Sequence, residues 1–232
     1  TGYSHHNLPD WVVKRNIKRL KKDAEWSQRV QLLQDFDFPQ AGLRLQYTAD
    51  GRHLIACGVY KPQFRVFDLA DLSMKFDRHL TAETVQMTLL GDDWRKLVLL
   101  QADRSVEFHG PSGLYHSTRI PRMGRDQAYD PWTCDLVIGA TGSEVFRLNL
   151  DRGQFLAPLQ TACSGEGGMN AVKVAPLHGL YGLGGDGGVV EFWDRRDRQR
   201  VASLTLSPSS SSSSSDSIDV SSLFFHPDGL HW

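Results

Sequence analysis

Cysteine is scarce in this 232-residue chain, and its three copies stand too far apart to form a disulfide framework or a metal site. They are Cys57, Cys134 and Cys163, an odd number without metal-ligand spacing. The chain also lacks any Asn-X-Ser/Thr sequence, so it offers no acceptor for N-linked glycosylation. Both absences exclude the small disulfide-rich secreted class and favour a reducing, non-secretory compartment.

Long apolar runs are missing too. No stretch approaches the ~18 apolar residues that a membrane span requires. The basic residues near the N-terminus follow an apolar triplet at residues 11–13 instead of preceding a long apolar region, so they do not form a signal peptide. The formal net charge of −1 excludes a chain that is polycationic throughout. We therefore expect an intracellular globular protein whose nucleic-acid contacts, if it makes them, come from local basic patches.

The sequence contains short matches to motifs of enzymes, but the surrounding residues do not predict the secondary structure that these motifs require. Residues 182–187 satisfy the spacing G-x-G-x-x-G, but an apolar run typical of a strand follows them, where a dinucleotide site requires a helix. Residues 139–142 occupy the same place in the preceding part of the chain, so both segments are interpreted as hairpin turns. The nine histidines show no HExxH or paired-ligand spacing. We expect no enzymatic activity, no metal and no cofactor.

A unit of about 40 residues is repeated four times, and it is the main feature that the sequence does contain. In each unit a tight-turn signal precedes a short apolar run and then an apolar-charged-apolar triplet. The apolar runs cover residues 54–57, 97–100, 136–138 and 180–183. The triplets are Phe64-Arg65-Val66, Val106-Glu107-Phe108, Phe146-Arg147-Leu148 and Val190-Glu191-Phe192. Their last residues lie 42, 40 and 44 positions apart, and the fourth runs into Trp193-Asp194, the dipeptide typical of WD repeats.

This repeat predicts an all-β fold of the WD40-type β-propeller class, in which each unit is one four-stranded blade. Residues 43–206 should form four consecutive antiparallel blades, with Val66, Phe108, Leu148 and Phe192 at equivalent buried positions. Residues 220–225, followed by the turn signal Asp228-Gly229, predict the first strand of a fifth blade. Because a closed WD propeller usually has roughly seven blades, and open sheet edges are avoided, the chain is interpreted as part of a longer protein.

Residues 1–29 differ from the repeats and predict a basic, partly helical extension. Apolar residues recur with helical spacing at Val13, Ile17, Leu20 and Ala24. Between residues 11 and 22 there are six basic residues and no acid: Lys14, Arg15, Lys18, Arg19, Lys21 and Lys22. Such a helix either docks its apolar stripe onto the propeller with a solvated basic face, or serves nuclear import or phosphate contact. The two roles are compatible.

Residues 30–232 are assigned to the propeller, with two special segments. Residues 30–38 predict a strand of the kind that completes the last blade of a closed propeller. Residues 207–217 contain seven consecutive serines and cannot bury apolar area, so they predict a mobile loop between the fourth blade and the fifth. A neutral low-complexity insertion is the favoured interpretation of this loop, and phosphorylation is the alternative.

Arginines gather at two further places inside the repeats. Arg119, Arg122 and Arg125 surround Ile120-Pro121 and Met123-Gly124. Four more follow the Trp193-Asp194 dipeptide: Arg195, Arg196, Arg198 and Arg200. The planar guanidinium group can bind phosphate in a bidentate manner, so both groups are candidates for RNA or partner contact. Pairing with acids on neighbouring blades is the alternative in each case.

Several segments that blade geometry does not require resemble one family. They include Leu8-Pro9-Asp10-Trp11, Tyr60-Lys61-Pro62-Gln63, Lys75-Phe76-Asp77-Arg78-His79, Arg119-Ile120-Pro121 and Glu191-Phe192-Trp193-Asp194. Together with intervening residues, from about Leu8 to Val201, they resemble the nucleolar protein 10 family, also called essential nuclear protein 2. The serine run is not typical of that family.

The resemblance implies a nucleolar, nuclear scaffold without catalytic activity. Such a factor belongs to the small-subunit processome and the U3 small nucleolar ribonucleoprotein context, and is needed for pre-rRNA processing and 40S (18S rRNA) maturation. Its expected partners are other processome assembly factors, pre-rRNA and U3 small nucleolar RNA, with no membrane and no small-molecule substrate. The alternative function is a generic WD40 adaptor that mediates protein–protein contacts in another nuclear or cytoplasmic complex.

Overall fold

The computed structural model consists of four sheets, each with four antiparallel strands in sequence order or its reverse. It describes residues 15–16, 18–20, 22, 38, 40–70, 72–163, 167–196, 198–206, 218–226 and 228. The strands are β1 (Gly42–Tyr47), β2 (His53–Gly58), β3 (Gln63–Asp68), β4 (Ser73–His79), β5 (Thr84–Leu89), β6 (Leu97–Gln101), β7 (Ser105–Gly110), β8 (Gly113–Arg119), β9 (Gly124–Asp130), β10 (Asp135–Ala140), β11 (Glu144–Asn149), β12 (Gln154–Gln160), β13 (Met169–Val174), β14 (Leu180–Gly185), β15 (Val189–Asp194) and β16 (Arg200–Thr205).

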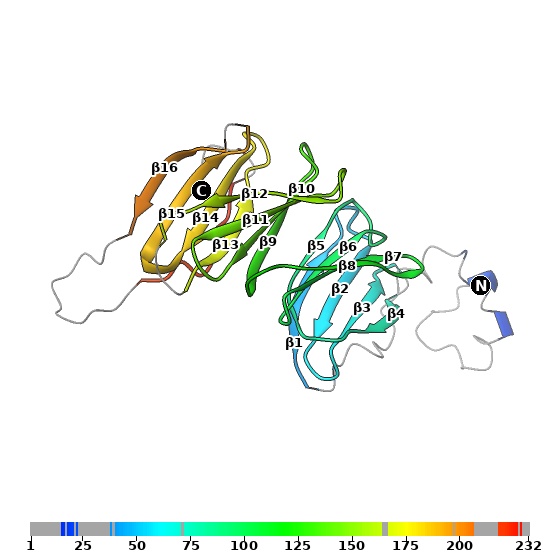
Figure 1. Ribbon diagram of the computed structural model, residues 1–232. Coiled ribbons are helices and arrows are strands. Elements are labelled where there is room, and N and C mark those ends of the chain that lie inside the picture. The colour runs from blue at the N-terminus through cyan, green and yellow to red at the C-terminus, as the bar shows by residue number, and fades with distance from the viewer. Residues whose placement is uncertain are drawn as a thin grey trace.

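Each sheet is one propeller blade, and Figure 1 shows the four blades following one another from the cyan end of the chain to the orange end. We number them 1 to 4, from β1–β4 to β13–β16. The first strands of successive blades contact one another, as β1 does β5, β5 does β9 and β9 does β13. The predicted all-β propeller fold is confirmed, and so are the four consecutive blades.

The apolar runs form the second strands, which are the most buried parts of the blades. Every residue of β2, β6 and β10 is buried, and in β14 all but the first are. Both faces of these strands are covered because the blades stack face to face. Their sequences are therefore apolar runs without the alternation of polar and apolar residues that a half-exposed strand shows. The fourth strand β4 alternates between exposed and half-buried residues, as a strand wetted on one face does.

The hydrophobic core lies between the blades. Ile55 and Phe64 of blade 1 pack with Met87 and Leu99 of blade 2 in one cluster. Two further clusters join blade 2 to blade 3 and blade 3 to blade 4 in the same manner. A single blade therefore leaves its apolar faces uncovered, and stability comes from stacking on the next one.

The register of blade 3 differs by one residue from the predicted alignment. The first turns are closed by the pairs 48–53, 90–96, 130–135 and 175–180. Two residues further along the second strand, the equivalent pairs of the second and third strands are Ile55 with Val66, Val98 with Phe108, Val137 with Arg147, and Gly182 with Phe192. Arg147 thus takes the place predicted for Leu148. Leu148 corresponds instead to Phe67, His109 and Trp193 in the other blades.

The prediction of four equivalent buried positions was therefore wrong for Leu148. Val66 and Leu148 are buried, whereas Phe108 and Phe192 are half-buried. In blade 3 the charged residue Arg147 occupies the core position that an apolar residue fills in the other blades, and the buried carboxylate of Asp135 pairs with it at 2.5 Å. Aligning the four triplets on their charged residue places blade 3 one residue out of register.

Part of the basic extension is described. Arg15, Asn16 and residues 18–20 are helical, in agreement with the predicted helix. Residues 30–37 and the serine-rich segment 207–217 lie outside the described residues, so the strand predicted for the first and the mobile loop predicted for the second remain predictions. The same holds for the domain boundaries at residues 29 and 30.

Residues 218–226 lie against blade 4 without forming the strand that was predicted for residues 220–225. Val220 and Leu223 are buried against Ala171 and Val190, and the Val220 amide donates a hydrogen bond to the Gly185 carbonyl at 3.2 Å. The described residues provide no second strand with which this segment could pair, so apolar packing places it without a ladder. The correction concerns its conformation, and the contacts of the segment are with blade 4.

The three cysteines should differ in reactivity. Burial raises the pKa of Cys57 to about 12 and also raises the pKa of Cys163, whereas Cys134 is half-buried in a turn. Because only the thiolate reacts, we expect iodoacetamide at pH 8 to alkylate Cys134 first. Peptide mass spectrometry of native and urea-unfolded protein measures this. Equal rates for Cys57 and Cys134 in the native protein would contradict the prediction.

Candidate nucleic-acid and partner interface

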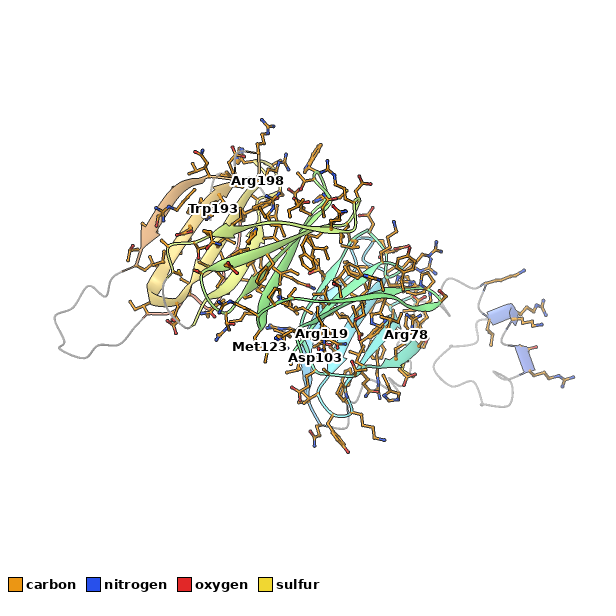
Figure 2. All side chains as sticks on the ribbon, viewed as in Figure 1. Arg78, Asp103, Arg119, Met123, Trp193 and Arg198 are labelled. Carbon is orange, nitrogen blue, oxygen red and sulfur yellow. The ribbon has the colours of Figure 1, made fainter. Side chains whose placement is uncertain are left out.

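The two arginine clusters lie at opposite ends of the blades. Strands alternate in direction, so the first and third turns of a blade lie at one end, and the second turn and the connection to the next blade lie at the other. Arg119, Arg122 and Arg125 flank the connection between blades 2 and 3, whereas Arg195 and Arg196 occupy the third turn of blade 4. Figure 2 shows Arg119 and Met123 well away from Arg198. The two clusters therefore form separate surfaces.

The connection-end cluster consists of exposed arginines with partial local support. Arg119 Nη2 lies 3.5 Å from Asp103 Oδ2, and both side chains are in contact with solvent. Arg125 Nη1 donates a hydrogen bond to Asn170 Oδ1 at 2.9 Å, which reaches across to blade 4. Arg122 lies against the second turn of blade 3, where a Cβ built on Gly142 would be 3.1 Å from its Nη1. Three positive charges are thus held close to one connection.

A fourth arginine, Arg104, joins this cluster and was not predicted. Its Nη1 donates a hydrogen bond to the Pro121 carbonyl at 3.2 Å, from a residue with a positive φ of 71°. The neighbouring Asp103 is partly buried, which acts to raise its pKa, but hydrogen bonds from Ser105 and the charge of Arg119 lower the pKa overall. Asp103 therefore stays ionised at neutral pH and offsets one of the four charges. The sequence signal was the tight turn Asp103-Arg104, which brings residue 104 near residue 121 only after the strands pair.

The third-turn cluster is divided between paired and exposed arginines. Arg195 Nη1 lies 3.3 Å from Asp130 Oδ1 of blade 3, and Arg200 Nη1 lies 3.1 Å from Glu191 Oε1 of its own blade. Both carboxylates are wholly buried. The charges of these two arginines are therefore used within the fold, in agreement with the alternative of acid pairing. Arg196 and Arg198 are exposed.

The basic extension presents its charges to solvent wherever it is described. Arg15, Lys18, Arg19 and Lys22 are all exposed. Lys14 and Lys21 lie outside the described residues. These exposed cations meet the condition for phosphate contact, and no acid lies between them in the sequence.

Buried carboxylates inside the blades accept hydrogen bonds from neighbouring groups of the fold. Glu191 accepts hydrogen bonds from the Ala162 amide at 2.9 Å and from Trp193 Nε1 at 2.8 Å. In blade 2, Glu107 Oε2 lies 3.0 Å from Nε2 of His109, whose pKa is lowered by burial although Glu107 acts to raise it. Residues i and i+2 of a strand share a face, which is why each acid meets its neighbour. Both acids are therefore engaged by groups of the fold itself.

Other functional classes receive no positive support. No three His, Cys, Asp or Glu side chains of the described residues gather in a way that could hold a metal ion. Among the helical residues described, none belongs to a segment with the length and apolar character of a membrane crossing. The glycine segment at residues 185–188 forms a turn with positive φ at Gly187 and Gly188, and β15 follows it directly. The hairpin-turn interpretation of that motif is confirmed.

Fold and surface together define a WD-type β-propeller that displays basic turns at both ends of its blades. The chain belongs to the nucleolar protein 10-like family, because residues 3–232 match the model described as "Nucleolar protein 10-like, N-terminal domain". The resemblance seen in the sequence is confirmed.

Relatives carry the corresponding names. The chain is 47% identical over 230 residues to "Ribosome biogenesis protein enp2 homolog" of Schizosaccharomyces pombe, covering 97% of this chain and 36% of that protein. It is 44% identical over 224 residues to "Ribosome biogenesis protein ENP2" of Saccharomyces cerevisiae, covering 97% of this chain and 31% of that protein. It is 42% identical over 199 residues to human "Nucleolar protein 10", covering 85% of this chain and 28% of that protein. The chain thus spans about a third of the length of these relatives.

Proposed function

We propose that this chain is the propeller part of a non-catalytic scaffold in ribosome biogenesis that acts in the nucleolus. The proposed place of action is the small-subunit processome, where the protein supports pre-rRNA processing and 40S maturation beside other assembly factors, pre-rRNA and U3 small nucleolar RNA. The observation that carries the proposal is the family match over residues 3–232, whose relatives are named for ribosome biogenesis and the nucleolus.

The geometry supports a scaffold with more than one contact surface. The connection-end cluster and the third-turn cluster lie at opposite ends of the blades, and the basic extension adds a third group of exposed cations. Separate basic surfaces allow one rigid body to hold different partners or different RNA segments at once. The buried acids, in contrast, are occupied by amide, indole and guanidinium donors that stabilise the blades.

Purification of the full-length protein from cells, followed by sequencing of the associated RNA, tests the function. We expect enrichment of U3 small nucleolar RNA and of pre-rRNA upstream of and within the 18S region. Recovery of an unrelated protein complex without either RNA would favour the generic adaptor and overturn the proposal.

The basic extension is tested in the same assay by replacing Lys14, Arg15, Lys18 and Arg19 with Gln. If these side chains contact phosphates, association with pre-ribosomal particles should weaken and its salt dependence should flatten, by about one unit of slope for each lost contact. The matched control removes four exposed charges elsewhere, at Arg52, Arg95, Lys96 and Arg152. Equal sedimentation of the extension variant and the wild type at every salt concentration would leave the basic face as a solvated surface. A variant with Arg119, Arg122 and Arg125 replaced by Gln examines the connection-end cluster in the same way.

A further inference from the structure

Trp132 is a large aromatic residue that the fold leaves in solvent. It lies in the turn between β9 and β10, and 76% of its surface is exposed, against 7% for Trp193 in the core. Tryptophan is enriched where proteins bind partners, because its flat ring gives a large contact area at little cost in side-chain entropy. Its exposure in a turn leaves the ring available to a ligand.

The turn that carries Trp132 is held in one conformation by a buried carboxylate. Asp130, which is wholly buried, accepts hydrogen bonds from the Trp132 amide at 3.0 Å and from Thr133 Oγ1 at 3.0 Å. Tyr181 of blade 4 donates its hydroxyl to the same carboxylate at 3.2 Å. Burial, with the nearby carboxylates, raises the pKa of Tyr181 to about 12, so the hydroxyl keeps its proton. The indole is thus displayed by a preorganised turn.

Arg195 completes this arrangement from blade 4. Its guanidinium lies 3.3 Å from Asp130 and 5.9 Å from the centroid of the Trp132 ring, a cation–π distance. It also lies over Gly179, whose φ is +63° and where a Cβ would come within 2.5 Å of Arg195 Cζ. Gly179 is therefore required both by its backbone conformation and by the close approach of Arg195. Through Arg195, the third turn of blade 4 contacts the first turns of blades 3 and 4.

The turn that supplies Arg195 carries further positive charge. Arg196 and Arg198 are exposed and follow Arg195 in the same turn. Residues 194–200 carry four arginines against two acids in the sequence. One of these acids, Asp194, accepts the Arg196 amide at 2.8 Å. An exposed aromatic ring beside arginines matches the chemistry of a nucleotide, which offers a flat base and a phosphate on each side. Charge complementarity favours this ligand over an apolar peptide.

We propose that Trp132, Arg196 and Arg198 form a binding site for single-stranded RNA, in which a base stacks on the indole and the two arginines contact flanking phosphates. This site deepens the proposed function and rests on it for the choice of RNA as the nucleic acid. Arg195 and Asp130 hold the ring in place, so the role assigned to Arg195 is support of Trp132, with phosphate contact left to Arg196 and Arg198. A paired duplex hides its base faces, so single strands are the expected ligand.

The test uses fluorescence anisotropy of the full-length protein with a labelled 12-nucleotide single-stranded RNA of mixed sequence and with the matching duplex. To isolate this site, the variants are also made in the background with Lys14, Arg15, Lys18 and Arg19 replaced by Gln. Trp132→Ala should weaken binding of the single strand about tenfold, and Trp132→Phe much less, because the phenyl ring still stacks. Duplex affinity should change little. The control is Tyr115→Ala, which removes an aromatic ring that is 88% exposed on β8.

The arginines are tested by the double replacement Arg196→Gln and Arg198→Gln. We expect weaker binding and a salt slope that is smaller by about 1.4, at about 0.7 for each phosphate contact to a single strand, while the double variant Arg52→Gln and Arg95→Gln leaves the slope unchanged. Thermal unfolding should be the same for Trp132→Ala as for the wild type, because the side chain is exposed. An equal loss for Trp132→Ala and Trp132→Phe, or no loss for either, would overturn the stacking proposal.

Two further outcomes separate this inference from the proposed function. If Trp132→Ala keeps its RNA affinity but loses a protein from the purified particles, the surface binds protein and the inference is overturned, while the processome role stands. If wild-type protein recovers neither U3 nor pre-rRNA from cells, yet binds single-stranded RNA through Trp132 in vitro, the proposed function fails and the site itself stands.

Discussion

Replacing Asp135 with Ala should lower the free energy of unfolding by about 3–5 kcal/mol, because it leaves a buried arginine without its carboxylate. Asp135 and Arg147 contact each other at 2.5 Å, with side chains only 2% and 4% exposed. Asn149 Nδ2 also donates to Asp135, at 2.7 Å. Among the described residues, Nε and Nη1 of Arg147 have no hydrogen-bond partner, so its charge depends on Asp135 and on the Tyr181 ring 5.9 Å away.

Urea unfolding followed by far-UV circular dichroism measures this loss. The matched control is the double variant Asp135→Ala and Arg147→Met, which removes both charges and keeps an apolar side chain of similar length. We expect it to recover a large part of the stability, because no charge remains buried without a partner. An unchanged urea midpoint for Asp135→Ala would show that water reaches Arg147, and would contradict the burial of the pair.

Replacing Asp126 with Ala should lower the free energy of unfolding by about 3 kcal/mol, because this carboxylate joins three blades and its loss takes the acceptor from the buried Val172 amide and from two half-buried donors. Asp126, at the start of β9, accepts a hydrogen bond from Gln86 Nε2 of blade 2 at 2.5 Å. From blade 4 it accepts the Val172 amide at 2.8 Å and Lys173 Nζ at 3.2 Å. The first strands of three consecutive blades therefore share one acceptor.

Hydrogen exchange distinguishes this effect from general destabilisation. The Val172 amide should lose more protection than the amides of β10, which bond within their own sheet. Asp151→Ala is the control, because Asp151 is an exposed acid in a turn of the same blade. Uniform loss of protection across all four blades would argue that Asp126 is one contributor among many and not a specific link between blades.

The sequence alone predicted the blades because their signals are local. Turn residues, short apolar runs and the Trp193-Asp194 dipeptide all lie within one unit of about 40 residues, and each unit repeats the others. Positions 54–57 and 97–100 form second strands as predicted, since a run covered on both faces must be apolar throughout. The family was also visible, since segments such as Tyr60-Lys61-Pro62-Gln63 are specific enough to identify it.

The candidate sites were predicted only as groups of basic residues. The sequence located the arginines at 119–125 and 195–200 and left acid pairing open, but it did not show that Arg104 joins the first group or which acid pairs with Arg195. Asp130 lies 65 residues before Arg195 and in another blade, so their contact exists only after two blades stack. The exposure of Trp132 could not be predicted either, because the sequence pattern around an aromatic residue in a turn does not show whether its side chain is buried or exposed.

The sequence by itself determined the fold class, the number and limits of the four blades, and the family, because each depends on a pattern repeated within a short stretch of chain. Only the tertiary structure decided the register of blade 3, the separation of the two arginine clusters and the display of Trp132. The physical reason is the same in all three cases. Local pattern records how much burial a residue favours, but whether a charge such as Arg147 is buried depends on a partner that another strand or another blade supplies.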